Sequence, residues 1–205
     1  MDTPRPVLII ACGALAREIQ ALRRANGWAI DLKCLAPELH NRPERIAPAV
    51  RAEIRAQRDR YRTIFVAYAE CGTMGQLDQV LAEEGVERLP GAHCYEFFAG
   101  PSAFAALADA EPGTFYLTDF LTRHFERLVI GGLGIDRHPE LAEEYFRNYR
   151  KVVYLSQGRS GALIEQARQI ASRLSLAFEH HFTGYGQLGT RLATLAKDTA
   201  PSWHT

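Results

Sequence analysis

Three of the four cysteines follow a predicted strand and precede a predicted helix, although the strand before the third, 86–93, is weak and is interrupted by Pro90 and Gly91. These three cysteines are Cys12, Cys71 and Cys94. The carboxyl ends of parallel strands lie at one edge of a sheet. We therefore expect the three thiols within about 10 Å of one another, if the first, third and fourth strands are neighbours. Thiols gathered at such an edge are candidate metal ligands or nucleophiles.

Gly13 and Gly72 follow two of these cysteines. Because glycine has no Cβ, both should leave room for a bound group beside the sulfur. The helix that begins near each cysteine directs N–H groups and its positive dipole end at the sulfur, which favours the thiolate. Zinc binds thiolates and imidazoles tetrahedrally, and three protein ligands leave one position open for reaction. A three-cysteine iron–sulfur cluster is the alternative, and the sequence does not separate the two.

Two histidines stand near the predicted thiol edge. His93 precedes Cys94, and His40 lies in a loop bracketed by two prolines, where it either completes the site or is simply exposed. Glu70, Tyr95 and Glu96 also flank the thiols and are candidates either to support the ligands through hydrogen bonds or to carry protons. The predicted metal ligands are therefore Cys12, Cys71, Cys94, His40 and His93.

The alternative is a protein without metal, whose cysteines fill the core, because cysteine is among the most buried residue types. Cys34 falls in the middle of a predicted strand, on its inward face, and we expect it in the core. His124, His180 and His181 lack neighbouring ligands at metal spacing. No G-x-G-x-x-G or Walker pattern follows the first strand, which argues against ordinary dinucleotide or ATP binding. The turn 158–161 could hold an anion, but a surface turn is the preferred explanation.

Strand-like runs alternate with helical segments along the chain. The predicted strands are 7–11, 28–35, 63–70, 86–93, 114–117, 151–156 and 176–182. The predicted helices are 14–25, 43–61, 73–84, 94–110 with a break at 100–101, one that begins at 118 or 119, 139–149, and one that begins near 161. This alternation is typical of an α/β, doubly wound, mostly parallel sheet with helices on both faces, Rossmann-like or flavodoxin-like. We predict one domain over 1–205, or two fused βα halves that divide near 111–113.

The composition narrows the range of partners. With 205 residues and 47% hydrophobic content, the chain can bury a sizeable core. Lys and Arg number 24, as do Asp and Glu, so no net field attracts nucleic acid or an anionic membrane, and we expect neither as a partner. No secretory signal and no membrane-length apolar run is evident, which predicts a cytoplasmic protein. In that reducing compartment, cysteines serve as thiols or ligands rather than disulfides.

Several motifs resemble those of an uncharacterised bacterial and archaeal family, the domain of unknown function 1638. The similar stretches are 12–13, 39–41 with Pro43, 68–72, 91–96 and 113–120, which span most of the chain. Members look to be associated with corrinoid-dependent methyl transfer in one-carbon metabolism. The resemblance thus implies a corrinoid protein or methyltransferase as partner and a small-molecule substrate near methylated amines or tetrahydrofolate. It is compatible with a metal-dependent transferase or a metallochaperone, or with a metal-free protein that docks on methyl-transfer enzymes.

Overall fold

The computed structural model describes residues 7–197, which divide into two compact units. The first unit is 7–97 together with 187–197, and the second is 98–186, so the boundary precedes the expected 111–113. Each unit has its own sheet, and every strand pair in both sheets is parallel. The predicted α/β doubly wound class is confirmed, although the strands are divided between two sheets.

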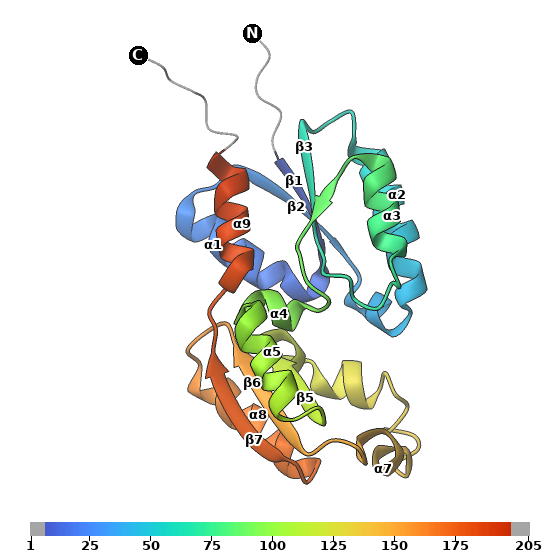
Figure 1. Cartoon of the computed structure of the whole chain (residues 1–205), viewed down its shortest axis with the longest axis vertical. Coiled ribbons are helices and arrows are strands. Elements are labelled where there is room, and N and C mark those ends of the chain that lie inside the picture. The colour runs from blue at the N-terminus through green and yellow to red at the C-terminus, as the bar shows by residue number, and fades with distance from the viewer. Residues whose placement is uncertain (1–6, 198–205) are drawn as a thin grey trace. The chain divides into compact units, whose positions relative to one another are not determined.

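The first unit is built on a four-stranded sheet. Its strands are β1 (Val7–Cys12), β2 (Ile30–Leu35), β3 (Thr63–Ala67) and β4 (Glu87–Arg88), in the order β2-β1-β3-β4. Its helices are α1 (Ala16–Asn26), α2 (Ile46–Gln57), α3 (Gln76–Glu84), α4 (Cys94–Ala99) and α9 (Gly186–Lys197), with 3-10 turns η1 (Gly13–Leu15), η2 (Pro37–Asn41) and η3 (Pro43–Arg45). Figure 1 shows α1 and α9 on one side of this sheet and α2 and α3 on the other.

β1 is the centre of the first sheet. All six of its residues are buried, because helices cover both faces of the sheet and a near-continuous apolar run suits that position. β1 pairs with β2 as far as Cys12 opposite Leu35, and with β3 as far as Ala11 opposite Ala67. The first, third and fourth strands are therefore neighbours, as the thiol prediction requires.

Arg51 and Arg55 of α2, and Arg58 directly after it, pair across to α3 rather than with the acidic residues of their own helix. Glu84 of α3 accepts from Arg55 at 2.7 Å and from Arg58 at 3.0 Å. Arg51 pairs with Glu83 in the same way. These ion pairs hold the outer surfaces of two neighbouring helices together, while Val50 and Ile54 of α2 face the core.

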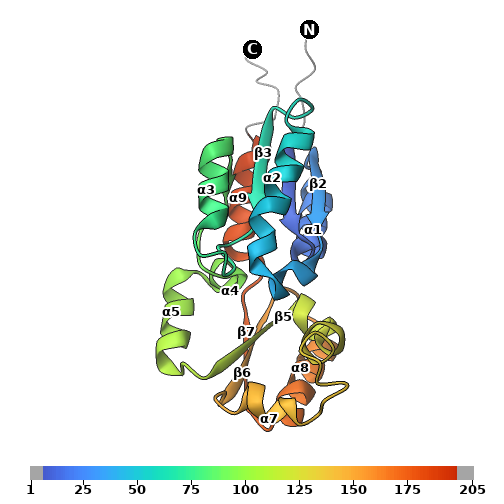
Figure 2. The ribbon, with the colours of Figure 1, turned by 90° about the vertical axis from the view of Figure 1, so that its right-hand side faces the viewer.

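The second unit is built on a three-stranded sheet in the order β5-β6-β7. Its strands are β5 (Thr114–Thr118), β6 (Lys151–Ser156) and β7 (Ala177–Phe182). Its helices are α5 (Pro101–Ala110), α6 (Asp119–Arg123), the π-helical turn η4 (Glu126–Ile130), α7 (Leu141–Phe146) and α8 (Gly161–Arg173). Figure 2 shows α7 and α8 on one side of this sheet and α5 on the other.

Alternate residues of β5 pack on opposite faces of the second sheet. Phe115 meets Phe125, Phe146 and Tyr149 in edge-to-face contacts on the face of α6 and α7. Tyr116, the next residue, meets Phe104 of α5 at a ring distance of 5.1 Å. The period of two along a strand thus gives each face its own aromatic cluster.

Asp119 joins the carboxyl ends of β5 and β6. Its side chain is buried and accepts from the Tyr154 hydroxyl at 2.6 Å and from the N–H groups of Gln157 and Gly158 at 3.1 Å each. The Gln157 side chain returns a bond by accepting from the Asp119 N–H at 2.9 Å. This network fixes the turn that precedes α8, so the turn 158–161 has a structural partner in Asp119.

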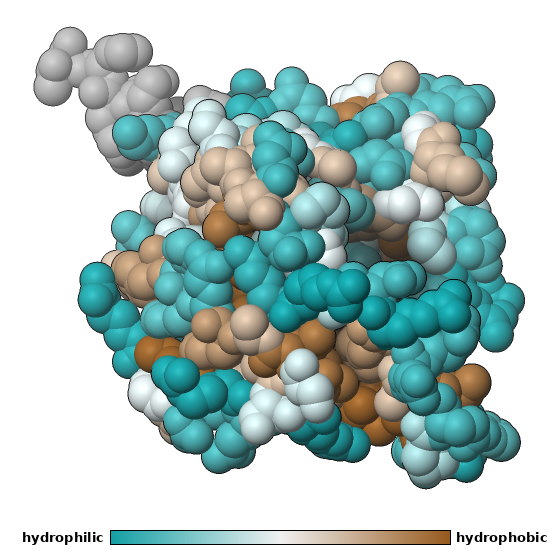
Figure 3. Space-filling model, turned by 60° about the horizontal axis from the view of Figure 1, so that its bottom comes forward, coloured by the Kyte–Doolittle hydropathy of each residue, from teal (hydrophilic) through white to brown (hydrophobic). Residues whose placement is uncertain are grey.

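The surface is mixed in character. Figure 3 shows hydrophilic side chains interleaved with hydrophobic areas on the face that it presents. No helix within 7–197 combines the length and hydropathy needed to cross a membrane. Helix α9 was not predicted, although Leu188, Leu192 and Leu195 recur at helical spacing and are buried.

Candidate thiol site

A small cavity of about 20 Å³ lies at the carboxyl ends of β1 and β3 in the first unit. We call it the thiol cavity. Its lining residues are Cys12, Ala14, Leu15, His40, Ala67, Tyr68, Ala69, Cys71, Cys94 and Phe97. Four of the five predicted metal ligands, Cys12, His40, Cys71 and Cys94, therefore line the same cavity.

Cys12 is positioned by a close approach between two loops. Its Sγ accepts from the Ala14 N–H at 3.4 Å, which caps η1. A Cβ on Gly13 would lie 2.9 Å from Pro37 Cδ and 3.0 Å from the Leu35 carbonyl oxygen. Only glycine lets the end of β1 approach the loop after β2 this closely. Gly13 therefore brings His40 within reach of Cys12 by packing, rather than by lining the cavity.

His40 faces the cavity with one ring nitrogen. Its Nδ1 lies 3.7 Å from Cys12 Sγ and 3.3 Å from the Pro37 carbonyl oxygen. The imidazole stacks on the Tyr68 ring, with centroids 6.1 Å apart and an interplanar angle of 11°. Desolvation, followed by the proximity of His93, holds the pKa of His40 below its usual value. A neutral imidazole is the form that can accept a proton or bind a metal.

Cys71 is held by a tight loop, 70–75, between β3 and α3. The Glu70 carboxylate accepts from Gly72 N–H at 2.8 Å, Thr73 Oγ1 at 2.6 Å and Gly75 N–H at 3.0 Å, and these bonds lower its pKa. Cys71 itself has a left-handed backbone, with φ of 55°. A non-glycine residue there is uncommon and costs conformational energy, which the bonds to Glu70 offset. Glu70 thus has a structural role, as the support of the loop that holds Cys71.

Backbone pairing continues beyond the last residues of β3 and β4. The Glu70 N–H donates to the Gly91 carbonyl at 3.0 Å, and the Cys71 N–H donates to the Ala92 carbonyl at 2.9 Å. Glu96 accepts from the Ala92 N–H at 2.9 Å and so caps the first turn of α4. Glu96 therefore orders the turn before Cys94, and its carboxylate is occupied by the backbone instead of facing the thiols.

Tyr68 is the cavity residue that chemical reasoning from the sequence missed. It is 1% exposed, and its hydroxyl is buried without a hydrogen-bond partner of normal geometry, although it lies next to the Cys12 sulfur. Burial, followed by the nearby thiols, raises the pKa of Tyr68, so the hydroxyl keeps its proton. A buried donor without an acceptor is costly and marks a place where a bound group could accept a hydrogen bond.

The thiols are protonated at neutral pH, contrary to the expectation of thiolates. Burial raises the pKa of Cys12 to about 12 and that of Cys71 to about 11, and it also raises the pKa of Cys94. Mutual repulsion between the ionised sulfurs adds to the effect. The helix dipoles are too weak to offset this rise in the thiol pKa values. The helix η1 is a single turn, and α3 begins only at Gln76, beyond the loop.

Several residues singled out from the sequence lie outside the cavity. His93 is exposed and contacts the Tyr95 ring at 6.3 Å, although it remains close enough to His40 to lower that pKa. Cys34 is exposed, so the prediction of a core position is wrong. β2 is an edge strand, and burial declines along it from Ile30, which is 1% exposed. Gly72 has φ of 77° and lies beside Pro43, where it allows the left-handed turn rather than lining the cavity.

The side chains at the cavity do not form a ready-made metal centre. Among residues 7–197, no group of three or more His, Cys, Asp or Glu side chains is placed so that it could hold a metal ion. Cys12 and His40 are both engaged with backbone groups. Any ion would have to displace these contacts and three thiol protons.

The fold and the site define an α/β protein with a buried thiol cluster at the carboxyl edge of a parallel sheet. The chain belongs to the family described as protein of unknown function (DUF1638), whose model matches residues 34–192. This match confirms the family resemblance and includes His40, Tyr68, Cys71 and Cys94, but it begins after Cys12. No curated protein and no solved structure matches the chain.

Proposed function

We propose that the thiol cavity binds one soft metal ion, with Cys12, Cys71 and Cys94 as ligands and His40 as a fourth. The observation that carries this proposal is the convergence of three thiols and a neutral imidazole on one cavity. Sulfur and imidazole donors suit zinc. A volume of about 20 Å³ accommodates roughly one water-sized particle, which favours a single ion over an iron–sulfur cluster.

The donor set fits the ion in chemistry, and binding requires the side chains to rearrange. The Cys12 sulfur would exchange its contact with Ala14 for the ion, and His40 would release the Pro37 carbonyl. The loop 70–75 already fixes the backbone of Cys71, so less ordering is needed there. Bound zinc can lower the pKa of a thiol or a water molecule and leave a nucleophile at neutral pH.

Tyr68 supplies the hydrogen-bond donor of the proposed site. Its hydroxyl is buried in the cavity and free to donate either to the Cys12 sulfur, once that sulfur is a thiolate, or to a substrate atom. The stacked His40 ring limits the movement of the phenol. Tyr68 would therefore stabilise negative charge in the cavity without gaining or losing a proton.

The wider role that we propose follows from the family resemblance. The protein would serve corrinoid-dependent methyl transfer in one-carbon metabolism as a metal-dependent transferase or accessory protein, with a corrinoid protein or methyltransferase as partner. Its substrate would be a small methyl donor or acceptor. The four free cysteines suit a reducing compartment, and we propose the cytoplasm.

The second candidate is a metal-free protein that docks on methyl-transfer enzymes. It is favoured by the protonated, hydrogen-bonded thiols and by the lack of a ready-made metal geometry in 7–197. In that case the thiols are part of the packed interior, and the burial of Cys12 follows from its place at the end of the central strand.

Elemental analysis separates the two candidates. Protein purified without a histidine tag and without oxygen should carry close to one equivalent of zinc if the first candidate is right. Less than about a tenth of an equivalent of any transition metal, in protein whose thiols remain reduced and which takes up no added zinc, leaves only the metal-free role.

The partner is tested separately by pull-down against a corrinoid protein, with and without a chelator. Recovery that falls with the chelator supports a metal-dependent complex. Equal recovery in both arms supports docking alone, and recovery in neither arm contradicts the proposed partner.

A further inference from the structure

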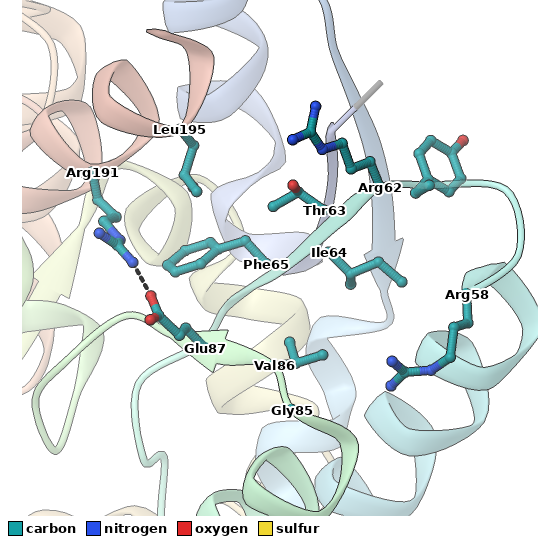
Figure 4. Close-up of a pocket in the computed structure, with 11 residues that line it drawn as sticks. Arg58, Arg62, Thr63, Ile64, Phe65, Gly85, Val86, Glu87, Arg191 and Leu195 are labelled. Atoms are coloured by element: carbon teal, nitrogen blue, oxygen red, sulfur yellow. Dashed lines mark hydrogen bonds and ion pairs between the residues drawn. The ribbon is translucent and has the colours of Figure 1, made fainter. Parts of the chain in front are cut away.

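An open cavity of the first unit lies at the amino ends of β3 and β4, away from the thiols. It has a volume of about 490 Å³ and contains three arginines and one carboxylate. We call it the arginine pocket. Its lining residues are Arg58, Tyr61, Arg62, Thr63, Ile64, Phe65, Gly85, Val86, Glu87, Arg191 and Leu195. Figure 4 shows Arg191 and Glu87 on one side, Arg58 on the other, and Ile64 and Val86 between them.

The carboxylates near the arginine pocket are already paired. Glu87 forms an ion pair with Arg191, whose guanidinium also lies over the Phe65 ring at 5.2 Å. Glu84, which does not line the pocket, is shared by Arg58 and Arg55. Two cations on one carboxylate leave positive charge on the Arg58 side.

Arg62 is the unpaired cation of the arginine pocket. It is exposed and forms no hydrogen bond or ion pair within the described part of the chain. A second open cavity of about 360 Å³ shares Tyr61 and extends the positive charge. The charged residues of this second cavity are Arg23, Lys33, Arg60 and Asp31. The surface at the amino ends of these strands is therefore cationic, although the whole chain has no formal net charge.

The floor of the arginine pocket is apolar. Ile64 and Val86 are half-buried, and the other two apolar lining side chains, Phe65 and Leu195, are buried. The volume falls in the range of small-molecule sites, and convergent cations over an apolar floor suit an amphipathic anion. The geometry points to a binding site for a small organic anion. Its phosphate or carboxylate group meets Arg62, and its aromatic or acyl part covers Ile64 and Val86.

Phenyl phosphate is a probe that carries both an anionic group and an aromatic ring. Inorganic phosphate has only the anionic group, and benzyl alcohol has only the ring. Titrations followed by backbone amide NMR shifts should show saturable binding of phenyl phosphate, with the largest shifts at Thr63, Val86 and Arg191. Arg62→Gln should weaken this binding about fivefold, the change typical of losing one exposed charge-assisted contact. Val86→Ser should weaken the binding of phenyl phosphate and leave the binding of inorganic phosphate unchanged.

Arg45→Gln is the matched control, because Arg45 is an exposed arginine of the same unit that does not line the pocket. It should leave the affinity unchanged. The proposal fails if phenyl phosphate does not saturate, if Arg45→Gln weakens it as much as Arg62→Gln, or if inorganic phosphate binds equally well. Because neither the probes nor the variants involve the thiol cavity, the outcome is independent of metal binding there.

Discussion

The Nδ1 atom of His40 lies 3.7 Å from the Sγ atom of Cys12, although the residues are 28 positions apart. This contact depends on Gly13, which lets the end of β1 meet the loop after β2. The other half of the cavity depends on two backbone bonds, from Glu70 to Gly91 and from Cys71 to Ala92. Two independent loop contacts therefore assemble the cluster.

Cysteine substitutions should divide into two classes. Cys12→Ser, Cys71→Ser and Cys94→Ser should each strip the bound metal, because a neutral hydroxyl replaces a soft sulfur ligand. Cys34→Ser is the control, since Cys34 is exposed, and it should retain the metal and change the free energy of unfolding by less than about 0.5 kcal/mol. Metal content by elemental analysis decides the matter: loss of metal in Cys34→Ser with retention in Cys94→Ser would contradict the site.

Alkaline pH should destabilise the metal-free protein. The thiols have pKa values near 9 when unfolded, whereas burial raises those of Cys12 and Cys71 to about 12 and about 11. The unfolded chain therefore loses these protons first, so the stabilisation is complete below pH 9 and is lost as the pH rises towards 11–12. Each thiol contributes a slope of at most about 1.4 kcal/mol per pH unit.

Denaturant unfolding between pH 8 and 10, in reducing buffer with a chelator, measures this slope. Cys12→Ser should flatten it, because one titrating group is removed. A wild-type curve that is level over this range would show that the thiols are not desolvated as described.

Gly13→Ala should destabilise the first unit by about 1–3 kcal/mol, because the new Cβ meets Pro37 and Leu35 at 2.9 and 3.0 Å. Gly161→Ala is the contrast: nothing lies within 4 Å of its Cβ position, at the start of α8, so it should be neutral or slightly stabilising. Chemical denaturation of both variants provides the comparison. Equal stability of the two would mean that the loop after β2 moves away at little cost.

Asp119→Asn should lower the stability of the second unit by about 2–4 kcal/mol. Both carboxylate oxygens of Asp119 accept hydrogen bonds, from Tyr154, Gln157 and Gly158. In the variant an NH₂ group replaces one of these oxygens and faces a hydrogen-bond donor, so a buried donor loses its acceptor. Asp109→Asn, at an exposed position of α5, is the control and should be nearly neutral. Hydrogen exchange of the β6 amides reports on the second unit directly, and unchanged protection there would contradict the role of Asp119.

The thiol convergence could be predicted because it depends on local pattern. A buried strand that ends in cysteine before a helix fixes the position of the sulfur at the strand end, and the common order 2-1-3-4 then brings Cys12, Cys71 and Cys94 together. In the structure all three cysteines line one cavity. The sequence left the strand order open, and the structure has the order β2-β1-β3-β4, which makes the first, third and fourth strands neighbours.

Other features depend on contacts that a linear pattern does not contain. Alternation assigned Cys34 to a face of its strand, but it could not tell that β2 forms the sheet edge. The alternation of helices and strands likewise does not say which strands share a sheet. Glu70 gains its role only when the loop 70–75 folds and presents its backbone N–H groups. Tyr68 gains its role only when its hydroxyl is buried beside Cys12 and its ring stacks on His40.

The division of the first unit into 7–97 and 187–197 has a consequence for synthesis. The ribosome makes the whole of 98–186 before it makes α9, which takes roughly 5–20 s at ordinary rates of elongation. During this interval α1 alone covers the face of the first sheet that it later shares with α9, and the arginine pocket lacks Arg191 and Leu195. The thiol cavity, in contrast, has all of its lining residues once Phe97 has emerged. The nascent chain can therefore assemble the thiol cavity well before the arginine pocket is complete.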